Sequence, residues 1–326
     1  MSEWRYWFAE QRGTLLALGI FVLMFVIYTA NHPAGLTVNV AQTAANKGVL
    51  LAFVAMAQTL VVITAGIDLS VGMIFILTNC LASWIVVGTP IETALGVAGV
   101  LLAGVVCGAV NGAIVIFGRL QPIVATIATG AAYFGLALLL RPSPGGSVNE
   151  DLADALTGRL FGVVPTSLVA LAAVVLVVWA PFRRSVTGRA AFAAGSAEAA
   201  AYMSGLPLKR AKFLAYTLSG LLAAIGGLFL TFFTYTGEAA FASGNAYTLF
   251  SIAAVVLGGV SLFGGRGSAV GAIFGAFAFR TIGDLLFVFD LDPLWQPLFQ
   301  GVVLLVAVSV GAVALVRVRN RLEWFG

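Results

Sequence analysis

Charged residues are scarce in this chain. Only 9% of its 326 residues are Asp, Glu, Lys or Arg, whereas 61% are hydrophobic. An average soluble domain carries about 25% charged residues, because its surface faces water. The composition therefore excludes an ordinary soluble protein and indicates a chain that lies mostly in lipid.

Residue types that carry catalysis and metal binding are scarce as well. None of the three lysines follows a glycine, so the chain lacks a G-x-x-x-x-G-K-[ST] phosphate loop for ATP hydrolysis. The single histidine, His32, cannot form an H-E-x-x-H metal site. Cys80 and Cys107 lie in apolar stretches without metal-ligand spacing, and we expect both to be packing residues. We therefore predict neither an enzyme nor a chain with a cofactor or metal of its own.

Long apolar stretches dominate what is present. Each is roughly 18–25 residues long, enough for a helix to cross a hydrocarbon core of about 30 Å. They do not alternate as barrel strands would, for example at residues 174–178. The first stretch is longer than a usual signal-peptide core and is expected to be a retained helix. The sequence predicts an all-α polytopic membrane protein, one transmembrane domain over 1–326, with about ten spans: 13–30, 47–65, 70–88, 93–117, 121–140, 163–182, 211–235, 248–263, 268–289 and 293–316.

Positive charges mark the two sides of the membrane. With the N-terminus inside, thirteen Lys and Arg residues fall on the inside: Arg5, Arg12, Arg119, Arg183, Arg184, Arg189, Lys209, Arg210, Lys212, Arg266, Arg317, Arg319 and Arg321. Only Lys47, Arg141 and Arg159 fall on the outside. This positive-inside bias predicts that both termini are cytoplasmic. The net charge of +4 is then an orientation signal, and we do not expect nucleic-acid binding.

Two deep charges stand in the ninth predicted span. Arg280 and Asp284 are four residues apart, so they share one helix face and are expected to pair. Such a pair either fixes helix packing or forms a polar contact in a substrate path. The spacing leaves both interpretations open.

The loop over 183–210 is the longest on the inside. Ser196 is a suitable helix N-cap, Glu198 would lie in the first turn, and Gly205 is a stop signal. We therefore predict a short helix over 196–205 outside the membrane. It would either rest on lipid headgroups or dock on a cytoplasmic partner.

Glycine-rich segments interrupt the apolar pattern at 66–72 and 258–268. In the first break Asp68 can N-cap a helix that starts at Leu69, and we assign hinge or capping roles to Gly66, Asp68, Ser70 and Gly72. Irregular backbone near a membrane is tolerated only where protein or a cavity surrounds it. Glycines spaced by four also predict close helix packing, within the chain or between subunits, at Gly104, Gly108 and Gly112 and at Gly267, Gly271 and Gly275.

Three segments carry a resemblance to a known family. Residues 59–72 (TLVVITAGIDLSVG), 252–267 (IAAVVLGGVSLFGGRG) and 204–223 resemble the ribose-type sugar permeases of ABC transporters, within the branched-chain amino acid and sugar permease superfamily. Asn111-Gly112 and residues 125–129 match more weakly. The similarity is collinear from about residue 40 to residue 310.

The resemblance implies a bacterial inner-membrane permease with ten spans and both termini inside. A second permease, identical or paralogous, would complete the pore. A cytoplasmic ABC ATPase would bind ATP and Mg and drive transport, and a periplasmic sugar-binding protein would deliver substrate. The coupling region maps to about residues 188–205, which makes Ser196, Glu198, Tyr202 and Gly205 the coupling candidates. In the ninth span, Gly283-Asp284-Leu285 replaces an Asn-Asn-Gly run of many relatives.

Three functions remain open on the sequence. The first is monosaccharide import by an ABC permease, and the second is import of a branched-chain amino acid, nucleoside or furanosyl signal molecule. The third is a secondary carrier or channel that works alone. A neutral polyol needs hydroxyl and amide groups, so the candidate substrate path comprises Asn79, Asn111, Thr126 and Thr129, with Arg280 and Asp284.

Overall fold

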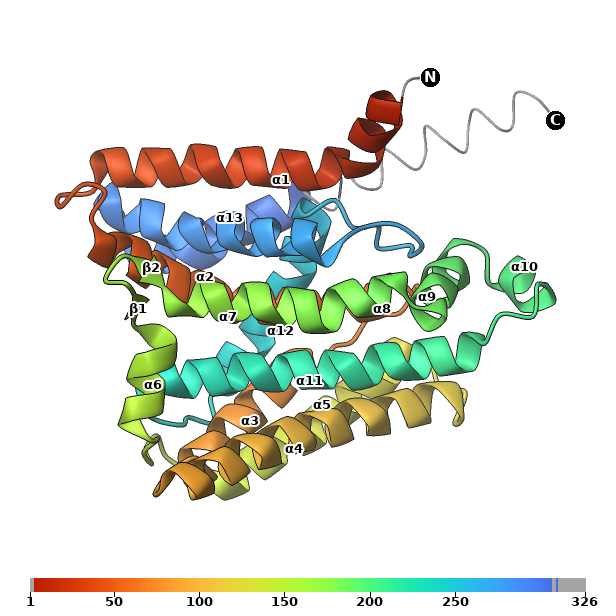
Figure 1. Ribbon diagram of the computed structural model, residues 1–326, viewed down its shortest axis with the longest axis horizontal. Helices are drawn as coiled ribbons and strands as arrows, with labels where there is room; N and C mark the ends of the chain where they lie inside the picture. Colours follow the sequence, from red (N-terminus) through yellow and green to blue (C-terminus); the bar gives the residue numbers. More distant parts are fainter. Residues whose placement is uncertain (1–2, 307–308, 310–326) are drawn as a thin grey trace.

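Helices that run back and forth between two ends make up most of the described structure. The computed structural model describes residues 3–306 and 309. At one end, here called the α10 end, lie α9 (Val186–Ser196), α10 (Glu198–Met203) and the start of α1 (Figure 1). At the other, the hairpin end, lie α6 (Glu150–Thr157) and the short antiparallel strands β1 (Arg159–Leu160) and β2 (Val164–Pro165) (Figure 1).

Seven helical segments among the described residues are long and apolar enough to cross a membrane. They are α1 (Glu3–Asn31, apolar over 11–31), α2 (Val38–Val62), α4 (Pro90–Ile116), α5 (Pro122–Leu140), the composite Thr166–Arg184, α11 (Leu208–Thr234) and α13 (Ala269–Val288). Shorter apolar helices are α3 (Val71–Ile85), α12 (Phe241–Leu257) and Gln296–Val306. The prediction of an all-α chain with several membrane helices is therefore confirmed. The end of the predicted span 293–316 and Arg317, Arg319 and Arg321 lie outside the described residues.

The composite segment changes its helix type in the middle. It consists of α7 (Thr166–Val174), the π-helical turn η1 (Val175–Trp179) and α8 (Ala180–Arg184). Pro181 follows the π turn, and a proline cannot donate the backbone hydrogen bond that a regular helix needs. The widened turn keeps the chain helical through this position.

Two helix starts differ from the prediction because of local caps. Helix α2 begins at Val38 rather than at residue 47, with the Thr37 hydroxyl accepting a 3.3 Å hydrogen bond from the Val40 nitrogen. Lys47, predicted in an outside loop, therefore lies inside α2. Helix α4 begins at Pro90 rather than at residue 93, after a capping box between Thr89 and Glu92.

Helix α2 is the centre of the fold. Almost every residue from Ala45 to Val62 is buried, and α11, α12, α13 and α7 pack around it. By contrast, α1 packs on α13 but exposes large apolar side chains such as Leu16 and Leu23 (Figure 1). A helix that is apolar all round belongs in a core or in lipid, and the chain uses both locations.

Small residues bring α4 and α11 into close contact. A methyl group added to Gly104 would lie 2.5 Å from the Gly220 carbonyl oxygen, and one added to Gly108 would lie 2.3 Å from the Tyr216 carbonyl oxygen. Gly112 faces the side chains of Phe213 and Tyr216. Backbones approach this closely only where no side chain intervenes.

The second glycine series is only partly helical. Gly271 and Gly275 pack against α12, where added methyl groups would lie 2.3 Å from the Gly258 oxygen and 2.1 Å from the Ala254 oxygen. Gly267 precedes α13 and has φ of +130°, so its prediction as part of the same helix face is wrong. The helix starts later because Ser268 caps the Val270 nitrogen.

Replacing Gly108 tests the contact between α4 and α11. We expect Gly108→Ala to lower the unfolding midpoint in detergent, because its methyl group would meet the rigid Tyr216 carbonyl. Gly135→Ala in α5 is the matched control, since nothing lies within 4 Å of its added methyl group. The control should be neutral, or stabilising by up to about 1 kcal/mol. Equal midpoints for the two variants would contradict the packing role.

Candidate functional site at the two helix breaks

The first break separates α2 from α3 over residues 63–70. Ala65 has a left-handed φ of +61°, which a residue with a side chain adopts only at a cost. Helix α3 starts at Val71, so the prediction that Asp68 caps a helix starting at Leu69 is wrong. Ser70 occupies the N-cap position, and Asp68 Oδ1 instead accepts hydrogen bonds from the Ser70 nitrogen (2.9 Å) and hydroxyl (2.6 Å). The Asp68 side chain therefore forms a turn that precedes the helix.

Polar side chains from α4 and α5 hold this break in place. Asp68 and Ser70 are fully buried, and the Asn111 amide donates a 2.7 Å hydrogen bond to the Ser70 hydroxyl. The Thr126 hydroxyl accepts a 2.9 Å bond from the Leu69 nitrogen, and the Tyr133 hydroxyl donates to Asn111 Oδ1 at 3.1 Å. We call Asp68, Ser70, Asn111, Thr126 and Tyr133 the Asp68 cluster. It joins irregular backbone to two neighbouring helices.

The predicted substrate-path residues fall into separate places. Asn111 and Thr126 belong to the Asp68 cluster, and Thr129 donates to the Thr126 carbonyl at 3.3 Å. Asn79 lies elsewhere, where it donates to the Thr231 hydroxyl (2.8 Å) and accepts from the Glu238 nitrogen (3.0 Å). Asn79, Asn111 and Thr126 are all buried. In this conformation their polar groups bind the protein itself.

The second break, residues 258–268, lies against the first. Gly264 and Gly265 have left-handed φ values of +85° and +72°, and the Gly265 nitrogen donates a 2.9 Å hydrogen bond to the Ile63 carbonyl. A methyl group added to Gly264 would lie 2.7 Å from the Ala65 nitrogen. The two breaks are thus joined through their backbones.

The end of α9 completes this contact. A methyl group added to Gly195 would lie 2.1 Å from the Ile63 oxygen and 2.4 Å from the Gly265 nitrogen. The Ser196 hydroxyl lies 3.5 Å from the Gly265 carbonyl. We call Ile63, Ala65, Gly195, Ser196, Gly264 and Gly265 the break junction. No local sequence signal indicates that these three segments meet.

The predicted helix over 196–205 is divided differently in the structure. Ser196 is the last residue of α9, and its hydroxyl donates to the Phe192 carbonyl at 3.0 Å, four residues back. Its predicted role as the N-cap of the next helix is therefore wrong. Helix α10 starts at Glu198, after Ala197 at an N-cap position without a side-chain bond. A serine that bonds to its own helix cannot also cap the following one.

Helix α10 ends as its glycine predicts. Gly205 has φ of +74°, and its nitrogen donates to the Tyr202 carbonyl at 3.0 Å, while the Leu206 nitrogen donates to the Ala201 carbonyl at 3.3 Å. These two bonds form a Schellman motif. Glu198 lies in the first turn and contacts Lys212 of α11, with 2.6 Å between Oε1 and Nζ. Tyr202 is 74% exposed at the tip, which leaves it available to a partner.

The charges in α13 do not pair as predicted. Asp284 Oδ1 lies 3.6 Å from Lys47 Nζ of α2, and Arg280 forms no ion pair with any described carboxylate. Asp284 pairs with Lys47 because α2 starts at Val38, nine residues earlier than predicted. Lys47 therefore lies within a helix that packs against α13. Both Arg280 and Asp284 line a cavity at the hairpin end.

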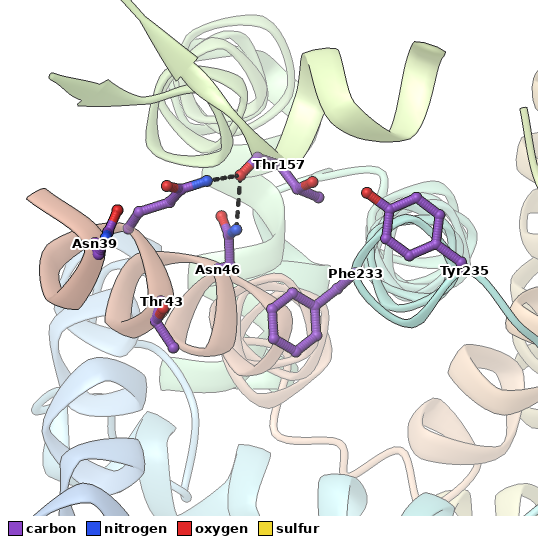
Figure 2. Close-up of a pocket in the computed structure, with 7 residues that line it drawn as sticks. Asn39, Thr43, Asn46, Thr157, Phe233 and Tyr235 are labelled. Carbon is purple, nitrogen blue, oxygen red and sulfur yellow. Dashed lines mark hydrogen bonds between the residues drawn. The ribbon is translucent and has the colours of Figure 1, made fainter. Parts of the chain in front are cut away.

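A second, smaller cavity of about 290 Å³ also lies at the hairpin end. Figure 2 shows its lining residues, which come from α2 and from the ends of α6 and α11. The Asn46 and Gln42 amides both donate 2.7 Å hydrogen bonds to the Thr157 carbonyl. Tyr235 donates to Asp154, and that hydrogen bond raises the pKa of Tyr235. These contacts fasten α6 to α2 and α11.

No group of three His, Cys, Asp or Glu side chains in the described part of the chain could hold a metal ion.

Substitutions of Asp68 test whether its hydrogen bonds stabilise the break. Asp68→Ala leaves the buried Ser70 nitrogen and hydroxyl without their acceptor, which costs about 1–3 kcal/mol for such a group. Asp68→Asn keeps an acceptor oxygen in place, so its unfolding midpoint should stay closer to that of the parent. The measurement is thermal unfolding in detergent. If the two variants lose the same stability, the charge rather than the hydrogen bonds matters.

Comparisons with known proteins place this geometry in a family. No solved structure matches the chain. Ribose import permease protein RbsC of Escherichia coli (strain K12) is 35% identical, over 93% of this chain and 94% of its own length. Fructose import permease protein FrcC of Rhizobium meliloti is 32% identical over 80% and 74%. Autoinducer 2 import system permease protein LsrC of Enterobacter sp. (strain 638) is 32% identical over 89% and 84%.

The family model described as "Branched-chain amino acid transport system / permease component" matches residues 40–308. This range contains both helix breaks, the α9–α10 segment and, apart from the first two residues of α2, all described membrane-length helices after α1. The chain belongs to this family of multi-pass membrane permeases.

Proposed function

We propose that the chain is the membrane-spanning permease subunit of an ATP-driven, binding-protein-dependent importer of a monosaccharide. The printed names of two relatives, a ribose and a fructose import permease, support this substrate class. The autoinducer 2 permease corresponds instead to the second function, the import of a signal molecule. The chain would form one transmembrane domain of about ten spans in a bacterial inner membrane. Both termini and the α10 end would be cytoplasmic.

Other subunits would supply the remaining parts of the transporter. ATP and Mg would bind a cytoplasmic ABC ATPase, and this chain would have no hydrolytic activity of its own. A second permease, identical or paralogous, would complete the pore, and a periplasmic sugar-binding protein would deliver the substrate. The family membership supports this division of labour.

The observation that carries the mechanism is the break junction. The end of α9 touches both helix breaks at backbone distance, so a displacement of α9 and α10 cannot leave the breaks unchanged. The first break leads into α3, and the Asp68 cluster links that break to α4 and α5. Helices α12 and α13 flank the second break. Closure of the ATPase on α10 would thus shift α3 and α12 relative to the long helices.

Reconstitution tests the function. The chain, its cognate ATPase and its binding protein in proteoliposomes should accumulate the sugar that the binding protein holds, and only with ATP. Uptake without the ATPase would support a carrier that works alone. Uptake of an amino acid in place of a sugar would contradict the proposed substrate class.

The ion pair between Glu198 and Lys212 gives a sharper test of coupling. Such an exposed pair contributes only about 0–1 kcal/mol to stability, so Glu198→Lys should leave folding intact. It should uncouple the two activities, so that ATP is hydrolysed without transport, because repulsion between two cations would push α10 away from α11. Glu198→Lys with Lys212→Glu restores opposite charges and should restore coupling. If the double variant remains as uncoupled as the single one, Glu198 acts directly on the ATPase and the pair is not the positioning element.

A further inference from the structure

A cavity of about 640 Å³ lies between α1, α2 and α13 at the hairpin end. Its polar lining includes His32, Thr43, Lys47, Arg280, Asp284 and Gln296. The coupling mechanism uses none of these residues, and the break junction lies at the opposite end of the helices (Figure 1). The cavity therefore needs an explanation of its own.

Positive charge exceeds negative charge in this lining. Lys47 and Asp284 partly offset each other at 3.6 Å, which is too long for a strong charged hydrogen bond. Arg280 forms no ion pair with any described carboxylate, although it is half-buried. With His32 counted as neutral, the lining residues that the structure describes thus carry one positive charge in excess.

The position of Arg280 makes that excess charge significant. It lies about two turns, or roughly 12 Å, before the end of α13 at Val288. A cation at such a depth is expensive unless it has a counter-charge or reaches a polar cavity. A guanidinium presents its donors in a planar fork that matches the oxygens of a phosphate group.

We propose that this cavity binds a phosphate-bearing ligand, either a free phosphoester or the headgroup of a phospholipid. Arg280 would bind two phosphate oxygens, and Lys47 would add a point charge. The volume falls in the range of about 300–1,000 Å³ that is usual for small-molecule sites, which leaves room for further atoms of the ligand beside the phosphate. Phe287 lies at the same cavity and is 70% exposed, where it can contact an acyl chain.

Thermal unfolding of the full chain in a neutral detergent tests the proposal with two probes. Glycerol 3-phosphate represents the free ligand and phosphatidylglycerol the lipid, with diacylglycerol, which has no phosphate, as the lipid control. At least one probe should raise the unfolding midpoint in a saturable way. Arg280→Gln should weaken the apparent affinity by roughly tenfold or more, as expected for loss of a charged hydrogen bond. The matched control is Arg210→Gln, an exposed arginine at the α10 end, which should leave the affinity unchanged.

A second variant, Asp284→Asn, is expected to bind more tightly than the parent, and a misfolded protein would not do so. The substitution removes the one carboxylate among the described lining residues and releases Lys47, so it should strengthen binding of either probe. A response to glycerol 3-phosphate identifies a free ligand, and a response to phosphatidylglycerol alone identifies a lipid headgroup. Four results would overturn the proposal: no response of the parent, equal weakening in Arg210→Gln and Arg280→Gln, no strengthening in Asp284→Asn, or displacement of the probe by ribose. The last result would assign the cavity to the sugar path.

Discussion

The close approach of three backbones at the break junction is the constraint on which the rest of this structure depends. Gly195, Gly264 and Gly265 bring α9 and both breaks together at distances that exclude a side chain. The hydrogen bond from the Gly265 nitrogen to the Ile63 carbonyl then satisfies backbone groups that the broken helices leave open. Glycine is required here for two reasons. Gly264 and Gly265 adopt positive φ, and a Cβ atom at any of the three positions would clash with the neighbouring backbone.

Burial of the first break requires a polar network on its other side. The chain turns from α2 into α3 through fully buried Asp68 and Ser70, and buried polar groups are costly without partners. Asn111 from α4 and Thr126 from α5 supply hydrogen bonds, so the break is fixed to both helices. The central helix α2 thus ends between two sets of contacts. One set is polar and internal. The other is the glycine contact with α9, and we propose that α9 and α10 are cytoplasmic and move when the ATPase closes.

Much of this organisation could be predicted from the sequence, because its signals are local. Apolar length locates the membrane helices, and glycine runs locate both breaks and the end of α10 at Gly205. The residue that occupies each helix cap was harder to predict. Asp68 and Ser70 both suit a cap, and only the fold decides that Ser70 takes the position while Asp68 forms the preceding turn. Ser196 likewise bonds backward into α9.

Contacts between distant segments could not be predicted. The pairing of Asp284 with Lys47 depends on how α2 packs beside α13, whereas the sequence offered only the nearby Arg280. The substrate-path candidates were chosen for their chemistry, yet buried amides such as Asn79 and Asn111 have the same chemistry when they bind the protein. The junction itself joins residues about 70 to 200 positions apart, beyond the range of any local propensity.

Filling the junction with one methyl group tests the central claim most directly. The methyl group that Gly195→Ala adds would lie 2.1 Å from the Ile63 oxygen and 2.4 Å from the Gly265 nitrogen, so α9 must move away from both breaks. The account predicts that this variant, once reconstituted with the ATPase and the binding protein, hydrolyses ATP without sugar uptake, whereas Gly135→Ala, whose added methyl group has nothing within 4 Å, does both. Uptake at the parental rate by Gly195→Ala would contradict the account.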